Sequence, residues 1–167
     1  MAGGTALSLQ LGHRQSIDFD FFTDKDFDEA EITTKLKALG TYTPDQIAPK
    51  TMLGYFNDVR FSLFWYRYPL IEETIDCVGI KLASPQDIAA MKLAAILGRG
   101  TKKDYIDIYF LNKSYSLEQM INFYNQKFGN AEQNQIALLR SLQYFEDAND
   151  SEMPVMFEKI DWETIKN

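Results

Sequence analysis

Short runs in which apolar and polar residues alternate predict β-strands in the first half of the chain. These runs are residues 17–22, 41–48, 51–57, 59–68 and 77–82. Pro44 and Pro49 confine the second run to a sheet edge or a loop, because proline lacks the amide hydrogen that an interior strand needs. Asn57-Asp58 has the residue types of a tight hairpin turn between the third and fourth runs.

Apolar residues three and four positions apart predict one helix near the start and a series of helices in the second half. The predicted helices are residues 6–11, 29–39, 85–97, 102–112, 116–128 and 131–145. Ser84, Pro85 and Asp87 form a strong helix start, with a serine cap, a proline at the first position and an acid that completes a capping box. Thr5 is the candidate cap of the first helix.

This order of elements predicts an α/β (α+β) fold with a mixed sheet and flanking helices, followed by a C-terminal helical bundle. The sheet is expected within residues 1–83, and the helical region packed on it within residues 84–167. Gly3-Gly4 has the pattern of a turn that follows a strand. We therefore expect either a truncated N-terminus or another segment that supplies the missing edge.

Composition and charge mainly exclude classes of protein. Hydrophobic residues make up 46% of the chain, which indicates a globular domain, and the net charge of −7 argues against a surface that coats nucleic acid throughout. A nucleic-acid acceptor could still bind in a local basic groove if the cations near the predicted site lined it together. These cations are Arg14, Lys92, Arg99, Lys102 and Lys103. The single cysteine and the lack of an apolar run of about 20 residues favour a cytoplasmic protein without a membrane partner.

The strand at residues 17–22 carries the first candidate chemistry, because alternation places Asp18 and Asp20 on one face. Two such carboxylates can hold Mg²⁺ or Mn²⁺ against the phosphates of a nucleoside triphosphate. The glycines and amides of Gly3, Gly4 and Thr5 would let the backbone approach that triphosphate. The alternative is an exposed strand face, since Asp-x-Asp is common by chance.

Between the glycines and the strand, Arg14 is a candidate phosphate ligand. Ser16 is equally well explained as a nucleotide ligand or as a hydroxyl that caps a turn, and His13 is interpreted as a bridge between backbone groups. Lys92 lies in an otherwise apolar helical run, so it should reach a cavity or a carboxylate. Arg99 lies on the same helix face and could bind phosphate with it, unless both simply extend from an exposed face.

Asp104 and Asp107 lie one turn apart on the next predicted helix. Either is a candidate third acid for the metal site or a general base for an attacking hydroxyl. For Asp104 the alternative is a charge that favours the helix start, and for Asp107 it is a buried pair with Lys92 or Arg99.

Two motifs in order, GGTALSLQLGHRQSIDFDFF near the start and DIAAMKLAAILGRGTKKDYIDIYFL in the middle, resemble the AbiEii/AbiGii toxin family within the polymerase-beta-type nucleotidyltransferases. The resemblance implies that Asp18 and Asp20 hold magnesium, that Gly4 and Thr5 contact the triphosphate, and that Lys92 binds phosphate. It also makes Asp104 the acidic member of the second motif. The strand at residues 59–68 offers no third carboxylate, which leaves Asp58 at its edge.

The resemblance implies metal-dependent transfer of a nucleoside monophosphate from a nucleoside triphosphate to an acceptor hydroxyl, with RNA as a candidate acceptor. It further implies a toxin-like role and an antitoxin protein as a candidate partner. The alternatives are a weakly active member that binds nucleotide or a partner protein, and a metal-dependent phosphotransferase that uses the same carboxylates.

Overall fold

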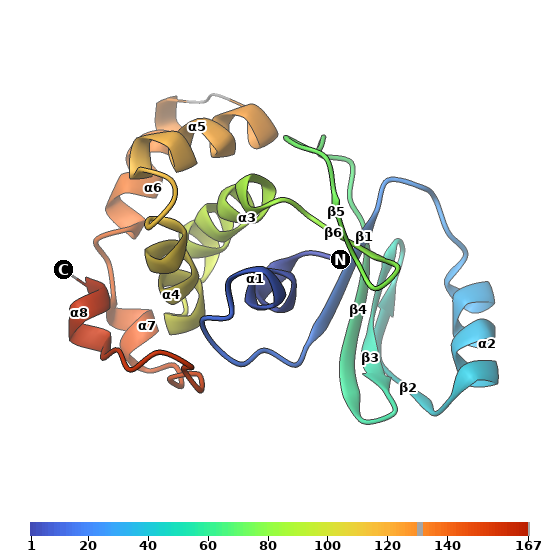
Figure 1. The fold of residues 1–167 in the computed structure, drawn as a ribbon. Coiled ribbons are helices and arrows are strands. Elements are labelled where there is room, and N and C mark those ends of the chain that lie inside the picture. The colour runs from blue at the N-terminus through green and yellow to red at the C-terminus, as the bar shows by residue number, and fades with distance from the viewer. Residues whose placement is uncertain (130–131, 167) are drawn as a thin grey trace.

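The computed structural model describes residues 1–129 and 132–166, with the side chains of residues 132–134 left aside. A mixed sheet stands between two layers of helices, with α2 (Glu29–Leu39) on one face and α1 (Gly3–Leu11) together with the helices that follow the sheet on the other (Figure 1). The predicted mixed sheet with flanking helices is therefore confirmed. None of the helices among the described residues has the length and apolar character that crossing a membrane requires.

The main sheet has four strands. In spatial order they are β1 (Phe19–Thr23), β4 (Val59–Trp65), β3 (Thr51–Phe56) and β2 (Tyr42–Ala48). β1 is parallel to β4, and the other neighbours are antiparallel. β2 lies at the edge, as Pro44 allows, and the turn between β3 and β4 has Asn57 and Asp58 at φ of 48° and 65°. Two positive φ values are the geometry that a two-residue hairpin favours.

The run predicted as one strand at residues 77–82 is a separate hairpin instead. β5 (Ile75–Cys77) and β6 (Ile80–Leu82) are antiparallel, and Val78 and Gly79 form the turn with φ of 52° and 80°. A positive φ is a rare conformation for a β-branched residue, so Val78 did not signal a turn in the sequence.

Seven helices accompany α2 in the described part of the chain. They are α1, α3 (Pro85–Gly98), α4 (Lys102–Leu111), α5 (Leu117–Phe128), α6 (Glu132–Ser141), α7 (Glu146–Asn149) and α8 (Trp162–Lys166). Ser84 caps α3 as predicted, because its hydroxyl accepts a hydrogen bond from the backbone amide of Asp87. The start predicted at Ala131 for the sixth helix lies outside the described residues, and that helix ends at Ser141 rather than Phe145.

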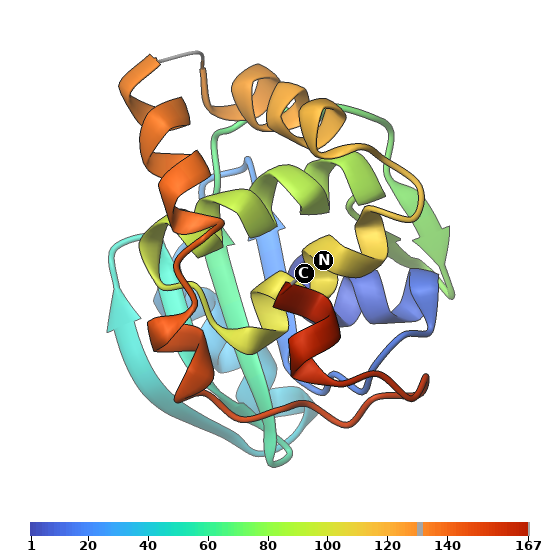
Figure 2. The ribbon, with the colours of Figure 1, turned by 90° about the vertical axis from the view of Figure 1, so that its left-hand side faces the viewer.

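Helix α3 is the centre of the core and lies across one face of the sheet (Figure 2). Its buried residues include the small Ala89 and Ala90, which permit close packing, and the large Ile88 and Leu93. Helix α1 packs on α3 and α4, so the core extends across residue 83. The division of the chain at that residue stays a prediction.

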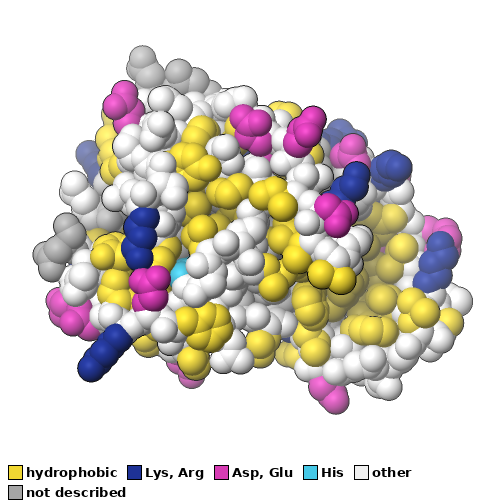
Figure 3. Space-filling view, viewed as in Figure 1, with side chains coloured by type: hydrophobic (Ala, Val, Ile, Leu, Met, Phe, Trp, Pro, Cys, Tyr) yellow, Lys and Arg dark blue, Asp and Glu magenta, His cyan; other side chains and the backbone are white. Residues whose placement is uncertain are grey.

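The opposite face of the sheet is covered only in part, because α2 has no buried residue. Phe19 remains 37% exposed there, and its ring stacks 6.4 Å from that of Phe21. Hydrophobic side chains accordingly gather between the β5–β6 hairpin and α2 (Figure 3). Aromatic rings thus form much of this face, whereas the Asp20 carboxylate of β1 lies on the side of α3.

The first two residues connect the hairpin to the main sheet. The Ala2 amide donates to the Asp20 carbonyl at 2.9 Å, and the Ala83 amide donates to the Met1 carbonyl at 2.8 Å. Met1 and Ala2 thus lie along the free edge of β1, at the place before Gly3-Gly4 where the sequence predicted a strand. Helix α1 then begins directly at Gly3 with Ala2 in the cap position, so the prediction that Thr5 caps this helix is wrong.

Candidate active site

A cavity of about 890 Å³ lies between the sheet and helices α3 and α4. Asp18 and Asp20 line its sheet wall, while Lys92, Arg99 and Asp104 line its helix wall. Four of these residues were the predicted catalytic set, and they come from segments more than 70 positions apart in the sequence. The fold therefore brings the two halves of the predicted site to one cavity.

The sheet wall presents two half-buried carboxylates. Asp20 is paired in register with Ser62 of β4, whose hydroxyl donates to Asp20 Oδ1 at 2.5 Å. Neither Asp18 nor Asp20 forms an ion pair with any residue that the structure describes. Arg60 of β4 is the cation on this wall and lines the same cavity without forming an ion pair with either acid, so both carboxylates are available to a bound cation.

Gly3 lines this cavity and must be glycine for two reasons. Its φ is +74°, and a Cβ there would lie 2.8 Å from Asp20 Oδ2. A Cβ on Gly4 would instead overlap the guanidinium of Arg14. The first glycine keeps the cavity open beside a carboxylate, and the second allows an arginine to pack under the helix.

Thr5, Ser16 and Gly4 were predicted to contact nucleotide, but the structure does not place them in the cavity lining. The Thr5 hydroxyl donates to the Asp18 carbonyl at 2.5 Å and lies 2.9 Å from the Ser16 hydroxyl. Both side chains therefore fix the backbone that carries Asp18. Ser16 contacts the hydroxyl of Thr5 rather than a turn, and its role as a nucleotide ligand stays a prediction.

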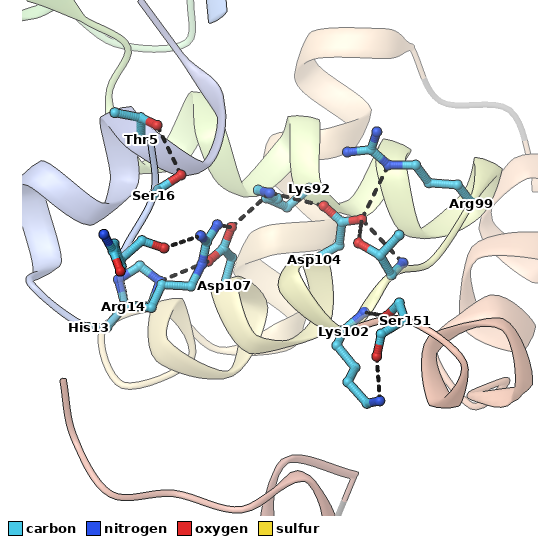
Figure 4. A network of polar contacts seen from close by, with 12 residues as sticks. Thr5, His13, Arg14, Ser16, Lys92, Arg99, Lys102, Asp104, Asp107 and Ser151 are labelled. Carbon is cyan, nitrogen blue, oxygen red and sulfur yellow. Dashed lines mark hydrogen bonds and ion pairs between the residues drawn. The ribbon is translucent and has the colours of Figure 1, made fainter. Parts of the chain in front are cut away.

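Lys92 is the centre of the helix wall (Figure 4). Its ammonium lies 2.9 Å from Asp104 Oδ1 and 2.7 Å from Asp107 Oδ2, and the residue is 7% exposed. Burial opposes the charge, but the carboxylates of Asp107 and Asp104 outweigh it and raise the pKa of the Lys92 ammonium. The lysine therefore stays charged at the cavity edge, and it reaches both a cavity and carboxylates as the sequence predicted.

Asp104 joins the helix wall to the start of α4. Its Oδ2 accepts the Thr101 hydroxyl at 2.7 Å and lies 3.4 Å from Arg99 Nε. Burial raises its pKa, yet Lys92 lowers it further, so the net shift is downward. Asp104 is thus both a helix-start acid and a residue of the cavity. Arg99 keeps a side chain that is 69% exposed beside the cavity, despite its contact with Asp104.

Asp107 and Arg14 lie outside the cavity lining, in a buried network with His13. Arg14 donates from Nε and Nη2 to the two oxygens of Asp107 at 2.7 and 2.8 Å, and His13 Nε2 lies 2.7 Å from Asp107 Oδ1 (Figure 4). Burial raises the pKa of Asp107, but Lys92 and Arg14 lower it well below the ordinary range. The geometry favours the buried pair with Lys92 over a third metal acid, and it leaves Arg14 no access to phosphate.

Ser62 is the cavity residue whose role sequence reasoning missed. Its only signal was a small polar residue inside a strand of large apolar ones. Among the cations considered for a basic groove, Lys103 lines the cavity with Lys92 and Arg99. Lys102 turns away instead, and its ammonium donates to backbone carbonyls of Asn149 and Ser151.

The residues of the cavity fit a divalent cation whose coordination shell is completed by oxygen atoms of a substrate. Within residues 1–129 and 132–166, no group of three or more histidine, cysteine, aspartate or glutamate side chains is arranged to hold a metal. Asp18 and Asp20 nevertheless reach one cavity with free oxygens. Mg²⁺ in phosphoryl-transfer sites is usually held by one or two carboxylates plus substrate phosphates, so two acids suffice.

Comparison with protein families decides the relationship of the chain. Residues 1–75 and 65–167 match the sequence model of the family described as "Nucleotidyl transferase AbiEii toxin, Type IV TA system". The chain belongs to this family. An uncharacterized protein of Aquifex aeolicus (strain VF5), aq_aa25, is 37% identical over 99% of this chain and 82% of its own length.

Solved structures agree with the family at the level of the fold. JHP933 from Helicobacter pylori has a TM-score of 0.51 and 18% identity over 91% of this chain and 75% of its own. A candidate nucleotidyltransferase from the same organism has a TM-score of 0.50 and 18% identity over 91% and 77%. The predicted fold class and the predicted family are therefore both confirmed. The AbiEii family is one of nucleotidyltransferase toxins, which agrees with the coarser functional prediction.

Proposed function

We propose that the protein transfers a nucleoside monophosphate from a nucleoside triphosphate to an acceptor hydroxyl in a reaction that depends on a divalent metal. One observation carries this proposal: Asp18 and Asp20 face Lys92, Arg99 and Asp104 across a single cavity of about 890 Å³. The cavity combines the carboxylates of Asp18 and Asp20 with cations from both walls, Arg60 on the sheet side and Lys92 and Arg99 on the helix side. Such a mixture suits a magnesium-bound triphosphate, because the acids can hold the metal and the cations can bind the phosphates.

Asp18 and Asp20 would hold Mg²⁺ or Mn²⁺ on the sheet wall. Ser62 would orient Asp20 through the hydrogen bond to Oδ1. When bound, the metal supplies positive charge that offsets the charge developing on the phosphates.

Lys92, Arg99 and Gly3 would bind the triphosphate from the helix side and from the start of α1. Lys92 is held in place by two acids, so its position is fixed before substrate arrives. Arg99 adds a second positive charge at this wall, and its side chain is largely exposed although it also contacts Asp104. Gly3 brings backbone close to the cavity without a side chain.

The reaction forms one bond and breaks one bond. The acceptor oxygen bonds to the α-phosphorus, and the bond from that phosphorus to the oxygen bridging to the β-phosphorus breaks. Pyrophosphate leaves with the electron pair, and the proton of the acceptor hydroxyl passes to solvent. The residues of both walls act by positioning and charge, which is how most enzymes of phosphate transfer work.

An RNA end is the acceptor that the family suggests. Membership in a family described as toxins of a toxin–antitoxin system also supports a cognate antitoxin. The single cysteine supports action in a reducing cytoplasm.

The test is incubation with Mg²⁺, total RNA and nucleoside triphosphates labelled at either the α- or the γ-phosphate. Label from the α-position in RNA or protein supports the proposal, and label from the γ-position would indicate a phosphotransferase instead. Asp20→Asn should reduce transfer by more than about 100-fold, the upper cost of losing an outer-shell partner of a metal, because a metal ligand itself is lost. Asp45→Asn is the matched control, since Asp45 is exposed on edge strand β2. Nucleotide binding without turnover, unchanged in Asp20→Asn, would contradict the proposal.

A further inference from the structure

A second cavity, of about 660 Å³, adjoins the first. Phe22, Tyr66 and Met91 line both cavities, so these side chains form the boundary between them. Phe22 follows Asp20 by two residues on the same strand face, a distance of about 7 Å. The second cavity therefore begins close to the carboxylates.

The cavity lies beyond the carboxyl ends of the parallel strands β1 and β4. The segments that follow these strands, residues 23–25 and 66–70, form much of its wall. Open α/β sheets place their ligands in the crevice outside the carboxyl ends of strands. The position is thus the one that the sheet topology favours for binding.

Aromatic rings form one side of this second cavity. The ring centroid of Tyr66 lies 5.1 Å from that of Phe22 and 5.0 Å from that of Tyr68. Tyr68 is 50% exposed, although its ring also contacts Phe128 at 4.7 Å. Tyr66 and Tyr68 both line the cavity, and Tyr68 is the more exposed of the two, while the Lys127 ammonium lies 5.4 Å from the ring centroid of Tyr66. A ring that faces a cavity is what stacking on an unpaired base requires.

Three exposed cations, Lys25, Arg67 and Lys81, line the cavity as well. None forms an ion pair with a described residue, although Lys81 faces Asp76 across the hairpin and Asp24 lies in the same wall. The guanidinium of Arg67 lies 3.8 Å from the ring centroid of Trp65, which orients it. In a chain with a net charge of −7, this local excess of positive charge is a specific feature.

The far wall of the cavity is fixed by a buried ion pair. Asp87 accepts the Ile71 amide at 3.0 Å and the Lys127 ammonium at 2.6 Å. Lys127 also donates to the Pro69 carbonyl at 2.7 Å. Helices α3 and α5 thereby hold the segment after β4 in place, so the cavity is preorganised.

We propose that the second cavity binds the unpaired end of the acceptor nucleic acid. A terminal base stacks on Tyr68 and Tyr66, and Lys25 and Arg67 bind the adjacent phosphates. This inference rests on the function proposed above. The first cavity, at about 890 Å³, is large enough for one nucleoside triphosphate, which leaves the second for the acceptor.

The test is equilibrium binding of a fluorescein-labelled single-stranded oligoribonucleotide without nucleoside triphosphate, followed by transfer kinetics. Tyr68→Ala and the double variant Lys25→Ala/Arg67→Ala should each weaken binding by about 10-fold. Tyr68→Phe should bind like the unmodified protein, because it keeps the stacking ring. The matched controls are Tyr55→Ala, on β3, and Lys37→Ala, on α2, which should change nothing. The double variant should also lower the slope of log affinity against log salt by about 0.7 for each lost phosphate contact.

Three results would overturn the inference. The first is unchanged binding in both variants, and the second is a duplex that binds as tightly as the single strand. The third is a raised KM for the triphosphate with unchanged oligoribonucleotide binding, which would place the substrate base in this cavity. Because the binding measurement needs no turnover, a protein without transfer activity would refute the proposed function while this site is still tested.

Discussion

The two walls of the first cavity carry aspartates in opposite states. On the sheet wall, Asp18 and Asp20 are half-buried and have no cation partner among the described residues. On the helix wall Asp104, and behind it Asp107, are buried and paired with cations through short contacts. Removing an acid that the fold has already paired leaves buried cations uncompensated and destabilises the protein, whereas an unpaired acid beside a cavity is available to a ligand.

The largest expected effect is a difference in the free energy of unfolding between substitutions on the two walls. Asp107→Asn should lower the free energy of unfolding by about 3–5 kcal/mol, because it leaves Lys92 and Arg14 without their shared buried acid. Asp18→Asn should change it by no more than about 0.5 kcal/mol. Urea denaturation of the two variants measures both values, and equal losses would mean that the walls do not differ.

The acid dependence of stability should come largely from the helix wall. The folded protein lowers the pKa of Asp107 and of Asp104 below the ordinary value of 3.8, so the unfolded chain binds these protons more readily. Their contribution is therefore complete above about pH 4 and declines as the pH falls through and below that value. Unfolding free energies measured from pH 7 to pH 3 should decline less in Asp107→Asn. An identical decline would place the acid-sensitive groups elsewhere.

The smallest effect compares two hydroxyls, one on each wall. Ser62→Ala removes the donor to Asp20 and should weaken Mn²⁺ binding by about 10–100-fold. Thr101→Ala removes the donor to Asp104 and should instead cost about 1 kcal/mol of stability, because it disrupts the start of α4. Calorimetry should therefore detect weaker Mn²⁺ binding only in Ser62→Ala, and urea denaturation should detect lower stability mainly in Thr101→Ala. Weaker metal binding in Thr101→Ala would contradict this division and would mean that both walls contribute to metal binding.

Sequence patterns predicted the sheet wall well because strand alternation determines which side chains share a face. Asp20 lies on β1, and Asp18 reaches the same cavity from the residue just before this strand, which begins at Phe19 rather than at the predicted residue 17. Lys92 was equally predictable, since a lysine among apolar helical residues must find a carboxylate or a cavity, and it finds both. The cap at Ser84 and the turn at Asn57-Asp58 followed from local chemistry alone.

The remaining features depend on contacts between distant segments. Arg14 carries the same guanidinium whether it binds phosphate or Asp107, and only the packing of α1 on α4 decides between them. Ser62 acquires its role from the parallel register with Asp20, which no local pattern encodes. Val78 was missed because its turn is made against the conformational preference of valine.

The position of Met1 has a practical consequence for preparing the protein. Its ammonium donates to the Lys81 carbonyl at 2.7 Å, and Met1 lines the second cavity. A purification tag joined ahead of Met1 would emerge beside the aromatic rings proposed to stack on the acceptor, and a polyhistidine sequence there could occupy them. A tag placed after α8, which packs on α4, avoids that cavity and leaves oligoribonucleotide binding free of interference.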